Sequence, residues 1–319
     1  MTPNRPANNA PPTTGPAPSH PPAPLTPAAP APDATSASTA HTANSAPTGN
    51  SAPTTNSVPT TNPDPTTNPD PTGTPPPLFQ LHQVTYRYRQ TTALDQITLQ
   101  IDAGTRLALL GANGCGKSTL LRILDGLYYA ESGYTLYEGD ELNEHYFQHD
   151  ELAYAFRKRV GLVFQNPDVQ LFCPTVFDEL AFGPLHLGWT KEKIREAVEE
   201  ALVHFHIESL RNRAPHHLSG GEKKRVAIAS VLIMDPDVVL LDEPIAALDP
   251  RSQEHVLELM RSWAAAGKTV VTATHDLDLL EETASHCVVL DRGKIVCAGL
   301  PGEVLSDRPL LRRANLVRT

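Results

Sequence analysis

The chain has 319 residues and a net charge of −10, and its composition changes sharply near residue 78. Residues 1–77 hold 22 of the 31 prolines and almost no large apolar side chains, so they cannot offset the entropy lost on ordering. We expect this tail to be disordered. Residues 78–319 carry a net charge of −8, which argues against nucleic acid as a partner, because duplex binding relies on Lys and Arg.

The tail contains a short repeat. The sequence Pro-Thr-Thr-Asn begins at Pro53, Pro59 and Pro65, six residues apart. This spacing is typical of a solvated, low-complexity linker rich in polyproline structure. Two alternatives stay open: the tail docks to a partner, or translation starts downstream at a non-AUG codon near Val58 or Leu78.

The cysteines and the hydropathy pattern indicate in which cellular compartment the chain works. The four cysteines show no CxxC spacing, which fits a reducing, cytosolic setting. No run reaches about 18 apolar residues, and the N-terminus lacks the basic and apolar regions of a secretory signal. We expect a chain that neither spans a membrane nor is secreted, so other subunits must supply any spanning helices.

The ordered region begins with strand patterns. Alternating apolar and polar residues at 78–88 and 93–101 predict two strands of an antiparallel sheet with one exposed face. A continuous apolar run at 106–111 predicts a strand buried on both faces. A helix-like stretch follows at 119–127. These patterns predict an α/β domain over residues 78–319, which is long enough to bury a core.

A phosphate-loop motif lies between that buried strand and that helix. It fits GxxxxGK[ST], whose glycines let several backbone N–H groups and a helix N-terminus point at one anion. Lys117 can reach the β- and γ-phosphates, and the Ser118 hydroxyl can ligate Mg²⁺. The predicted nucleotide-binding residues of this loop are Gly111, Ala112, Asn113, Gly114, Cys115, Gly116, Lys117, Ser118 and Thr119.

A second buried-strand run, at 238–244, contains two carboxylates near its end, Asp242 and Glu243. At the carboxyl edge of a parallel sheet, Asp242 can hold Mg²⁺ through water, and Glu243 can polarise the attacking water as a general base. The alternative is a helix N-cap followed by an acid in the first helical turn. In a chain that also has a phosphate loop, we favour the catalytic interpretation.

Residues 216–232 contain the most discriminating motif. Here the sequence LSGGE, ending at Glu222, precedes a long amphipathic stretch and resembles the signature motif of the ATP-binding cassette (ABC) family. The resemblance implies that Ser219, Gly220 and Gly221 form a second γ-phosphate cradle at a helix N-terminus. The family more often has Gln where Glu222 stands. A capping box between Ser219 and Glu222 is compatible with this role.

The resemblance covers essentially all of residues 78–319. It implies a P-loop ATPase core with an antiparallel β subdomain and a helical subdomain over about 166–222. It also implies that ATP and Mg²⁺ are the cofactors, with Ser118, Gln165 and Asp242 around the metal ion. Gln165 corresponds to the loop glutamine that senses Mg²⁺ and γ-phosphate.

Three further positions match the family. Tyr88 corresponds to the aromatic residue that stacks on adenine, and Tyr86 on the same strand face is the competing candidate. Asp249 corresponds to the loop that crosses between two cassettes. His275 corresponds to the switch histidine that contacts γ-phosphate. The family therefore implies Glu243, His275 and Gln165 as catalytic residues.

The family resemblance also implies partners. Two cassettes would bind ATP head to tail, either as two copies of this chain or as this chain with a related cassette. Residues 165–187 are apolar and interrupted by prolines, and in the family this region receives a coupling helix from a transmembrane subunit; packing within the helical subdomain is the alternative. The sequence of this segment is similar to those of energy-coupling-factor importers, particularly cobalt and nickel uptake ATPases. This resemblance implies that the chain works at the cytoplasmic face of the cell membrane.

Three other functions are compatible with parts of the sequence to different degrees. A vitamin importer of the same type and a soluble ABC ATPase stay open. A DNA-repair or chromosome-maintenance ATPase is disfavoured, because the 102 residues from Lys117 to Ser219 are too few for a long coiled coil. The pair His145 and His149 has i,i+4 spacing but no evident third ligand, so we expect a solvated helix face there and not a metal site.

Overall fold

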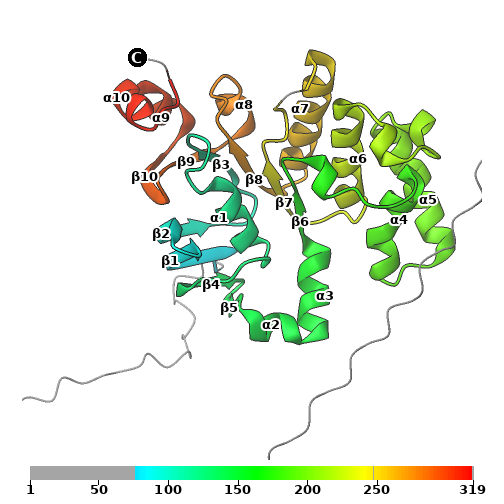
Figure 1. Ribbon diagram of the computed structural model, residues 1–319, viewed down its shortest axis with the longest axis horizontal. Helices are drawn as coiled ribbons and strands as arrows, with labels where there is room; N and C mark the ends of the chain where they lie inside the picture. Colours follow the sequence, from blue (N-terminus) through cyan, green and yellow to red (C-terminus); the bar gives the residue numbers. More distant parts are fainter. Residues whose placement is uncertain (1–75, 247, 318–319) are drawn as a thin grey trace, which may run out of the picture. The chain divides into compact units, whose positions relative to one another are not determined.

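Two β-sheets form the centre of the computed structural model, which describes residues 76–246 and 248–317 (Figure 1). The tail predicted to be disordered therefore lies outside the described residues, apart from Pro76 and Pro77. The first sheet is antiparallel, as expected. It has the order β2-β1-β4-β5 and consists of β1 (Phe79–Tyr88), β2 (Thr91–Ile101), β4 (Ser132–Tyr137) and β5 (Asp140–Glu141).

A bulge in β1 breaks the simple alternation of the sequence. Phe79 and Leu81 are buried at the start of the strand, but the register shifts between Leu81 and Val84, where Gln83 has a φ of 48°. Beyond the bulge, Val84 and Thr85 are both buried, and the register shifts again before Tyr86 and before Arg87. The rings of the next two even residues, Tyr86 and Tyr88, are 5.1 Å apart on one side of the strand.

The second sheet is mainly parallel and has the order β10-β9-β3-β8-β7-β6. Every residue of β7 and β8 is buried, because helices cover both faces of this sheet. The continuous apolar runs in the sequence anticipate this burial. The strands are β3 (Arg106–Leu110), β6 (Val160–Val163), β7 (Val238–Asp242), β8 (Thr269–Thr274), β9 (His286–Asp291) and β10 (Lys294–Gly299), of which β10 is antiparallel to β9.

Strand register brings three chain segments together at one edge. Leu110 at the end of β3 pairs with Thr274 at the end of β8, and Asp242 at the end of β7 pairs with Ala273. The residues that follow these strands are therefore neighbours at the carboxyl edge of the parallel sheet, which is where ligands bind in open α/β sheets.

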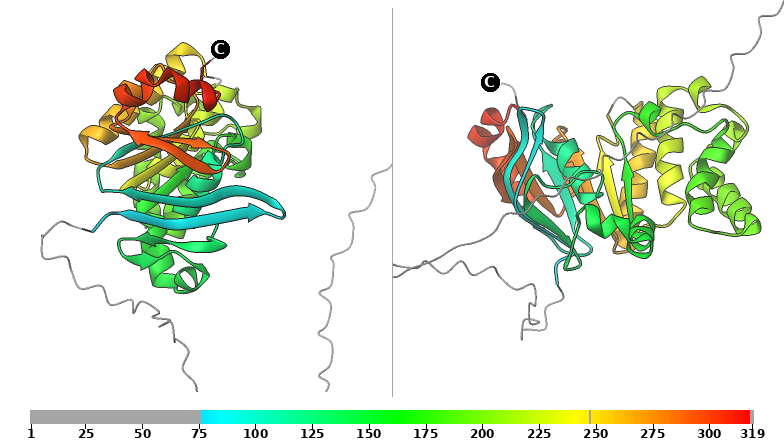
Figure 2. Two further views of the ribbon diagram at one scale, coloured as in Figure 1. Left: turned by 90° about the vertical axis from the view of Figure 1, so that its left-hand side faces the viewer. Right: turned by 60° about the horizontal axis from the view of Figure 1, so that its bottom comes forward.

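Helices cover the sheets and fill the long connections. Helix α1 (Lys117–Leu124) packs against β7 and β8 of one sheet and β2 of the other, and it begins two residues before the expected helix. The group between β6 and β7 lies on the side of the parallel sheet away from β1 and β2 (Figure 2). It comprises η1 (Pro167–Val169), α4 (Val176–His186), α5 (Lys191–His204), η2 (Glu208–Leu210), η3 (Pro215–His217) and α6 (Gly220–Leu232).

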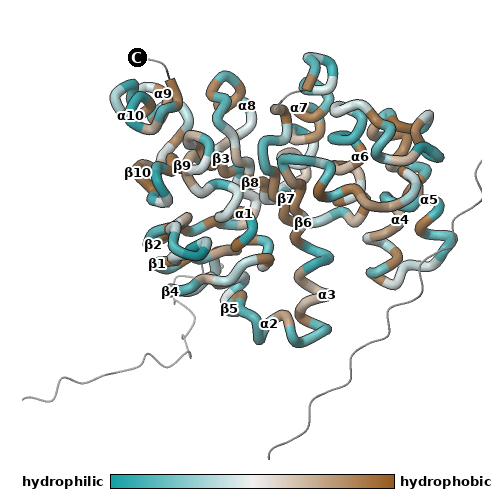
Figure 3. Tube along the Cα trace, in the orientation of Figure 1, coloured by the Kyte–Doolittle hydropathy of each residue, from teal (hydrophilic) through white to brown (hydrophobic). Residues whose placement is uncertain are grey.

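The remaining helices are α2 (Glu144–Gln148), α3 (Asp150–Arg159), α7 (Pro250–Ala265), α8 (Leu280–Thr283), α9 (Pro301–Ser306) and α10 (Arg308–Arg313). Hydrophobic residues are prominent along central strands such as β6 and β7 (Figure 3). One buried cluster joins the two sheets through α1, a second joins β6–β8 to α4–α7, and a third lies under α8–α10. The described residues therefore share a core that runs through both sheets.

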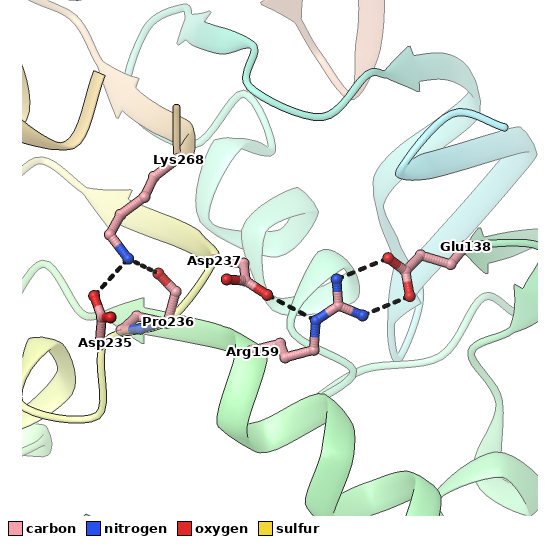
Figure 4. A network of polar contacts seen from close by, with 6 residues as sticks. All are labelled: Glu138, Arg159, Asp235, Pro236, Asp237 and Lys268. Atoms are coloured by element: carbon pink, nitrogen blue, oxygen red, sulfur yellow. Dashed lines mark hydrogen bonds and ion pairs between the residues drawn. The ribbon is translucent and has the colours of Figure 1, made fainter. Parts of the chain in front are cut away.

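A polar network fastens the two sheets at the amino-terminal edge of β7 (Figure 4). Arg159, the last residue of α3, donates hydrogen bonds to both carboxylate oxygens of Glu138, at 2.6 and 2.8 Å, and to Asp237, at 2.8 Å. Glu138 follows β4 of the first sheet, whereas Asp237 precedes β7 of the second. The forked guanidinium matches this planar, two-carboxylate arrangement.

Candidate nucleotide-binding site

The phosphate loop is held tightly between the two sheets. Gly116 forms the N-cap of α1 with a φ of 115°, and a Cβ atom there would lie 2.6 Å from the carbonyl oxygen of Ala93. A Cβ on Gly111 would lie 2.4 Å from the carbonyl oxygen of Leu290. Only glycine fits at these two positions without moving neighbouring backbone. The first-turn amides of α1 then form an anion-binding terminus.

Two predicted catalytic side chains, Glu243 and His275, meet the predicted nucleotide-binding Lys117 beside this loop. The Lys117 ammonium donates hydrogen bonds to the carbonyl oxygens of Gly111 (2.6 Å) and Ala112 (3.3 Å), and it lies 3.7 Å from a carboxylate oxygen of Glu243. The same Glu243 oxygen is 2.9 Å from Nδ1 of His275. The strand register therefore brings Lys117, Glu243 and His275 into one contact group.

Glu243 has an unusual backbone. Its φ is 48°, which is uncommon for a residue with a side chain, and its amide donates to the carbonyl oxygen of Ala273 at 3.0 Å. The carboxylate is buried. The alternative interpretation of Asp242 and Glu243 as a helix N-cap is wrong, because β7 ends at Asp242 and the next helix begins at Pro250.

The Asp242 carboxylate suits a metal ion. Asp242 is buried, and its Oδ1 has no hydrogen-bond partner among residues 76–246 and 248–317. A buried, unpaired carboxylate oxygen is costly unless a cation or a water completes its coordination. Oxygen ligands such as carboxylates, amides and hydroxyls are those that Mg²⁺ prefers. The residues present therefore fit a Mg²⁺ ion held by Asp242.

A cavity of about 420 Å³ contains most of the predicted site. Among the residues that line it, Ser118, Gln165 and Asp242 are the expected metal neighbours, and Lys117 and Glu243 lie beside them. His275 reaches this group through Glu243. The other lining residues are Tyr88, Thr91, Thr92, Ala93, Asn113, Gly114, Gly116 and Thr119.

The two tyrosine candidates have different surroundings. Tyr86 stacks face to face on Tyr128, with ring centroids 5.0 Å apart, and is packed against the core. Tyr88 lines the cavity, is 39% exposed, and has its hydroxyl 3.3 Å from the Thr119 hydroxyl and 3.4 Å from a nitrogen of Arg122. Tyr88 therefore lines the cavity beside the phosphate loop, with its ring in edge contact with those of Tyr86 and Tyr128, and Tyr86 does not line the cavity.

The signature residues lie at a separate place. Ser219 is the N-cap of α6, and it forms the expected capping box with Glu222: the Ser219 amide donates to the Glu222 carboxylate at 2.7 Å. This backbone hydrogen bond lowers the pKa of Glu222. Ser219, Gly220 and Gly221 are absent from the lining of the cavity among the described residues. One chain thus presents a phosphate loop and a signature that face different spaces.

Asp249 also lies outside this cavity. It is the N-cap of α7, where its carboxylate accepts hydrogen bonds from the amides of Arg251 and Ser252, both at 3.1 Å. Its second oxygen accepts from the Ser252 hydroxyl at 2.6 Å. A Cβ on Gly221 would lie 3.6 Å from this oxygen, so Asp249 sits beside the signature and not beside the phosphate loop.

A buried lysine that the sequence analysis missed lies behind Gln165. Lys224 of α6 donates to the carbonyl oxygens of Phe164 and Gln165, both at 3.1 Å, and lies 3.5 Å from that of Asp242. Burial lowers the pKa of Lys224 to about 8, although Asp242 and Glu243 oppose the shift. The available signal was a lysine in the apolar stripe of a helix, in line with Ala227 and Ile228.

The histidines within residues 76–246 and 248–317 form no metal cluster. His145 and His149 have ring nitrogens 3.3 Å apart, yet the described part of the chain contains no group of three or more possible metal ligands. No helix within those residues has both the length and the apolar character needed to cross a membrane.

Comparisons with known proteins identify the family. Residues 94–246 match the ABC transporter family. The chain is 53% identical over 244 residues to "Nickel import ATP-binding protein NikO" of Rhodobacter capsulatus, which covers 76% of this chain and 96% of that protein. It is 45% identical over 238 residues to "Energy-coupling factor transporter ATP-binding protein EcfA" of Carboxydothermus hydrogenoformans, which covers 74% and 86%.

Solved structures agree with the sequence relatives. The structure of cbiO1 from Clostridium perfringens, described as part of the transporter complex cbiONQ, is 34% identical, with a TM-score of 0.63 over 76% of this chain and 95% of that one. The dimeric cassette MJ0796 is 28% identical, with a TM-score of 0.64 over 70% and 98%. The chain therefore belongs to the ABC transporter family, as one of its ATP-binding and ATP-hydrolysing subunits.

Proposed function

We propose that this chain is the ATPase of a membrane importer and that the imported solute is nickel or cobalt. The observation that carries the ATPase part is the contact group of Lys117, Glu243 and His275 beside the unpaired oxygen of Asp242. The nickel part rests on the 53% identity to a nickel import protein. A vitamin importer of the energy-coupling-factor type is the second candidate, because relatives of that type also match.

In the proposed site, Ser118, Gln165 and Asp242 would hold Mg²⁺, which would supply positive charge against the phosphates. The Glu243 carboxylate takes a proton from the attacking water, while His275 holds the carboxylate from one side and contacts the γ-phosphate. Lys117 supplies a positive charge at the β- and γ-phosphates, and Tyr88 stacks on the adenine.

Two cassettes complete each site in this proposal. Ser219, Gly220 and Gly221 do not line the cavity of their own chain, so a second cassette must bring its signature to the γ-phosphate. The partner is a second copy of this chain or a related cassette, and Asp249 lies at the crossing between the two. ATP then closes the pair and hydrolysis opens it, because the closed state binds ATP more tightly.

The variant Glu243→Gln tests this mechanism. We expect it to lower the hydrolysis rate by about 10²–10⁴, the usual contribution of a positioned base, while ATP binding persists. With Mg²⁺ and ATP, the variant should accumulate as a closed pair of twice the cassette mass in size-exclusion chromatography with light scattering. Unchanged turnover in this variant would show that Glu243 is not the base.

An apolar surface supports a membrane partner. Phe172 is 66% exposed and Phe182 is 39% exposed, their ring centroids are 4.8 Å apart, and both line a cavity of about 410 Å³ together with Arg157. The buried Glu179 carboxylate accepts hydrogen bonds from the amides of Phe172 and Cys173, at 2.9 and 2.8 Å, which fixes the loop that carries Phe172. Exposed aromatic residues held in this way mark a docking surface.

We propose that a transmembrane subunit docks there, at the cytoplasmic face of the cell membrane. Phe172→Asp should abolish copurification with polytopic subunits from membranes and leave ATP binding intact, whereas Val203→Asp, at a 59% exposed position on α5, should change neither. Uptake of nickel, cobalt and vitamins into cells that lack the gene then separates the candidates. Wild-type protein that never associates with membrane subunits would favour a soluble ABC ATPase.

A further inference from the structure

The loop that carries Gln165 is fastened to helix α6 by a buried ammonium group. Lys224 is 3% exposed, and its two shorter hydrogen bonds, both 3.1 Å, go to the backbone carbonyl oxygens of Phe164 and Gln165. The third contact, 3.5 Å to the carbonyl oxygen of Asp242, is long for a hydrogen bond. Lys224 thus touches the backbone on both sides of the proposed Mg²⁺ site without entering the cavity.

A second side chain ties the same loop to the same helix. Gln170 accepts a hydrogen bond from the Phe164 amide at 3.1 Å and donates to the carbonyl oxygen of Ala227 at 2.7 Å. Its amide nitrogen is also 3.2 Å from the Ser230 hydroxyl. The loop is therefore tied to two successive turns of α6, first through Lys224 and then through Gln170.

The helix that holds the loop also carries the signature. Helix α6 begins at Gly220, directly after Ser219, and Lys224 lies about one turn from that end. A buried ammonium that loses its acceptors costs more than the loss of a neutral hydrogen bond, so the loop and the helix resist separation.

We infer that Lys224 is a positioning residue that makes Gln165 move as one body with the signature helix. This inference rests on the proposed pairing of cassettes. When Ser219 closes on a nucleotide held by the other cassette, Lys224 brings Gln165 to the metal side of its own cavity. Occupancy of one site then sets the geometry of the other.

The first test compares Lys224→Met with Lys224→Arg. The Met side chain has nearly the length of lysine but no hydrogen-bond donor. We expect the kcat of this variant to fall roughly tenfold to a hundredfold, because misplacing a catalytic group by about 1 Å can cost that much. The KM for ATP should change less than about threefold. Lys224→Arg keeps the donors and should recover most of kcat. Lys268→Met is the matched control, because its hydrogen bonds go to Asp235 and Pro236 and not to residues 164–170, and it should retain wild-type turnover.

The second test is independent of hydrolysis and of folding failure at Lys224. Gln170→Met removes a second tie without changing charge, and amide hydrogen exchange should show faster exchange at residues 164–170 than in wild type, together with a smaller loss of kcat. Normal kcat in Lys224→Met, equal losses in Met and Arg, or unchanged exchange in Gln170→Met overturns the inference. If wild-type protein itself neither pairs nor hydrolyses ATP, the proposed function fails, and the exchange result still decides whether the tie exists.

Discussion

At Asp125, a carboxylate at the end of α1 is buried next to the partly exposed guanidinium of Arg157. Arg157 donates to a carboxylate oxygen of Asp125 at 3.2 Å and to its backbone oxygen at 2.6 Å. Burial raises the pKa of Asp125 to about 7, and Arg157 only partly opposes the shift. The unfolded chain has a pKa of about 3.9 at this residue, so between pH 4 and 7 the folded state holds a proton that the unfolded state has released. Stability from this group is therefore present at low pH and lost as pH rises to 7.

Asp125→Asn should remove that dependence. The difference in free energy of unfolding, variant minus wild type, should rise by roughly 2–4 kcal/mol from pH 4 to pH 8, because an amide has no charge to bury. Arg157 keeps its bond to the backbone oxygen. Urea unfolding at several pH values measures the difference, with Glu131→Gln, which changes a half-exposed carboxylate, as the control. A difference that stays constant with pH would contradict the burial argument.

Residue chemistry in the site was only partly predictable. Lys117, Asp242, Glu243 and His275 could be expected near one another, because each follows or ends an apolar strand run and such ends meet at one sheet edge. Lys224 could not, because its role depends on backbone carbonyls whose direction no residue pattern encodes. The choice between Tyr86 and Tyr88 as the adenine-stacking residue was ambiguous for a related reason. The packing of neighbouring rings, and not the spacing along the chain, decides which tyrosine lines the cavity.

At the scale of elements, the capping box holds the N-terminus of α6 through Ser219 and Glu222. Glu222→Ala removes the acceptor for the Ser219 amide, and we expect a loss of about 0.5–2 kcal/mol in free energy of unfolding. Glu222→Gln keeps an acceptor and should stay within about 0.5 kcal/mol of wild type. Chemical denaturation of the two variants checks this. Equal losses would mean that charge near Arg213, 3.8 Å away, matters more than the cap.

Element types were more predictable than their irregularities. The alternation at 78–88 and the apolar runs at 106–111 and 238–244 correctly predicted antiparallel and buried parallel strands. The bulge at Gln83 was not predictable, because a single residue with positive φ leaves no periodic signal. The expected bounds of the helical subdomain, about 166–222, stay a prediction, although helices do follow one another there.

For the whole molecule, the link between the two sheets is the feature most open to test. Arg159→Met breaks the hydrogen bonds to Glu138 and Asp237, whose side chains are 43% and 60% exposed, so we expect a loss of only about 1 kcal/mol that shrinks in high salt. Lys268→Met, which loses an ion pair within the second sheet, is the control and should cost less. Thermal unfolding at two salt concentrations makes the comparison. A loss for Arg159→Met that does not change with salt would contradict an electrostatic link.

The separation of Ser219 from the cavity of its own chain has a genetic consequence. Under the paired arrangement proposed above, a copy damaged at Lys117 still lends a sound signature, and a copy damaged at Ser219 still lends a sound phosphate loop. Each mixed pair would contain one whole catalytic centre and one that is doubly broken. Two defective alleles expressed together would then partly restore uptake that neither allele supports alone.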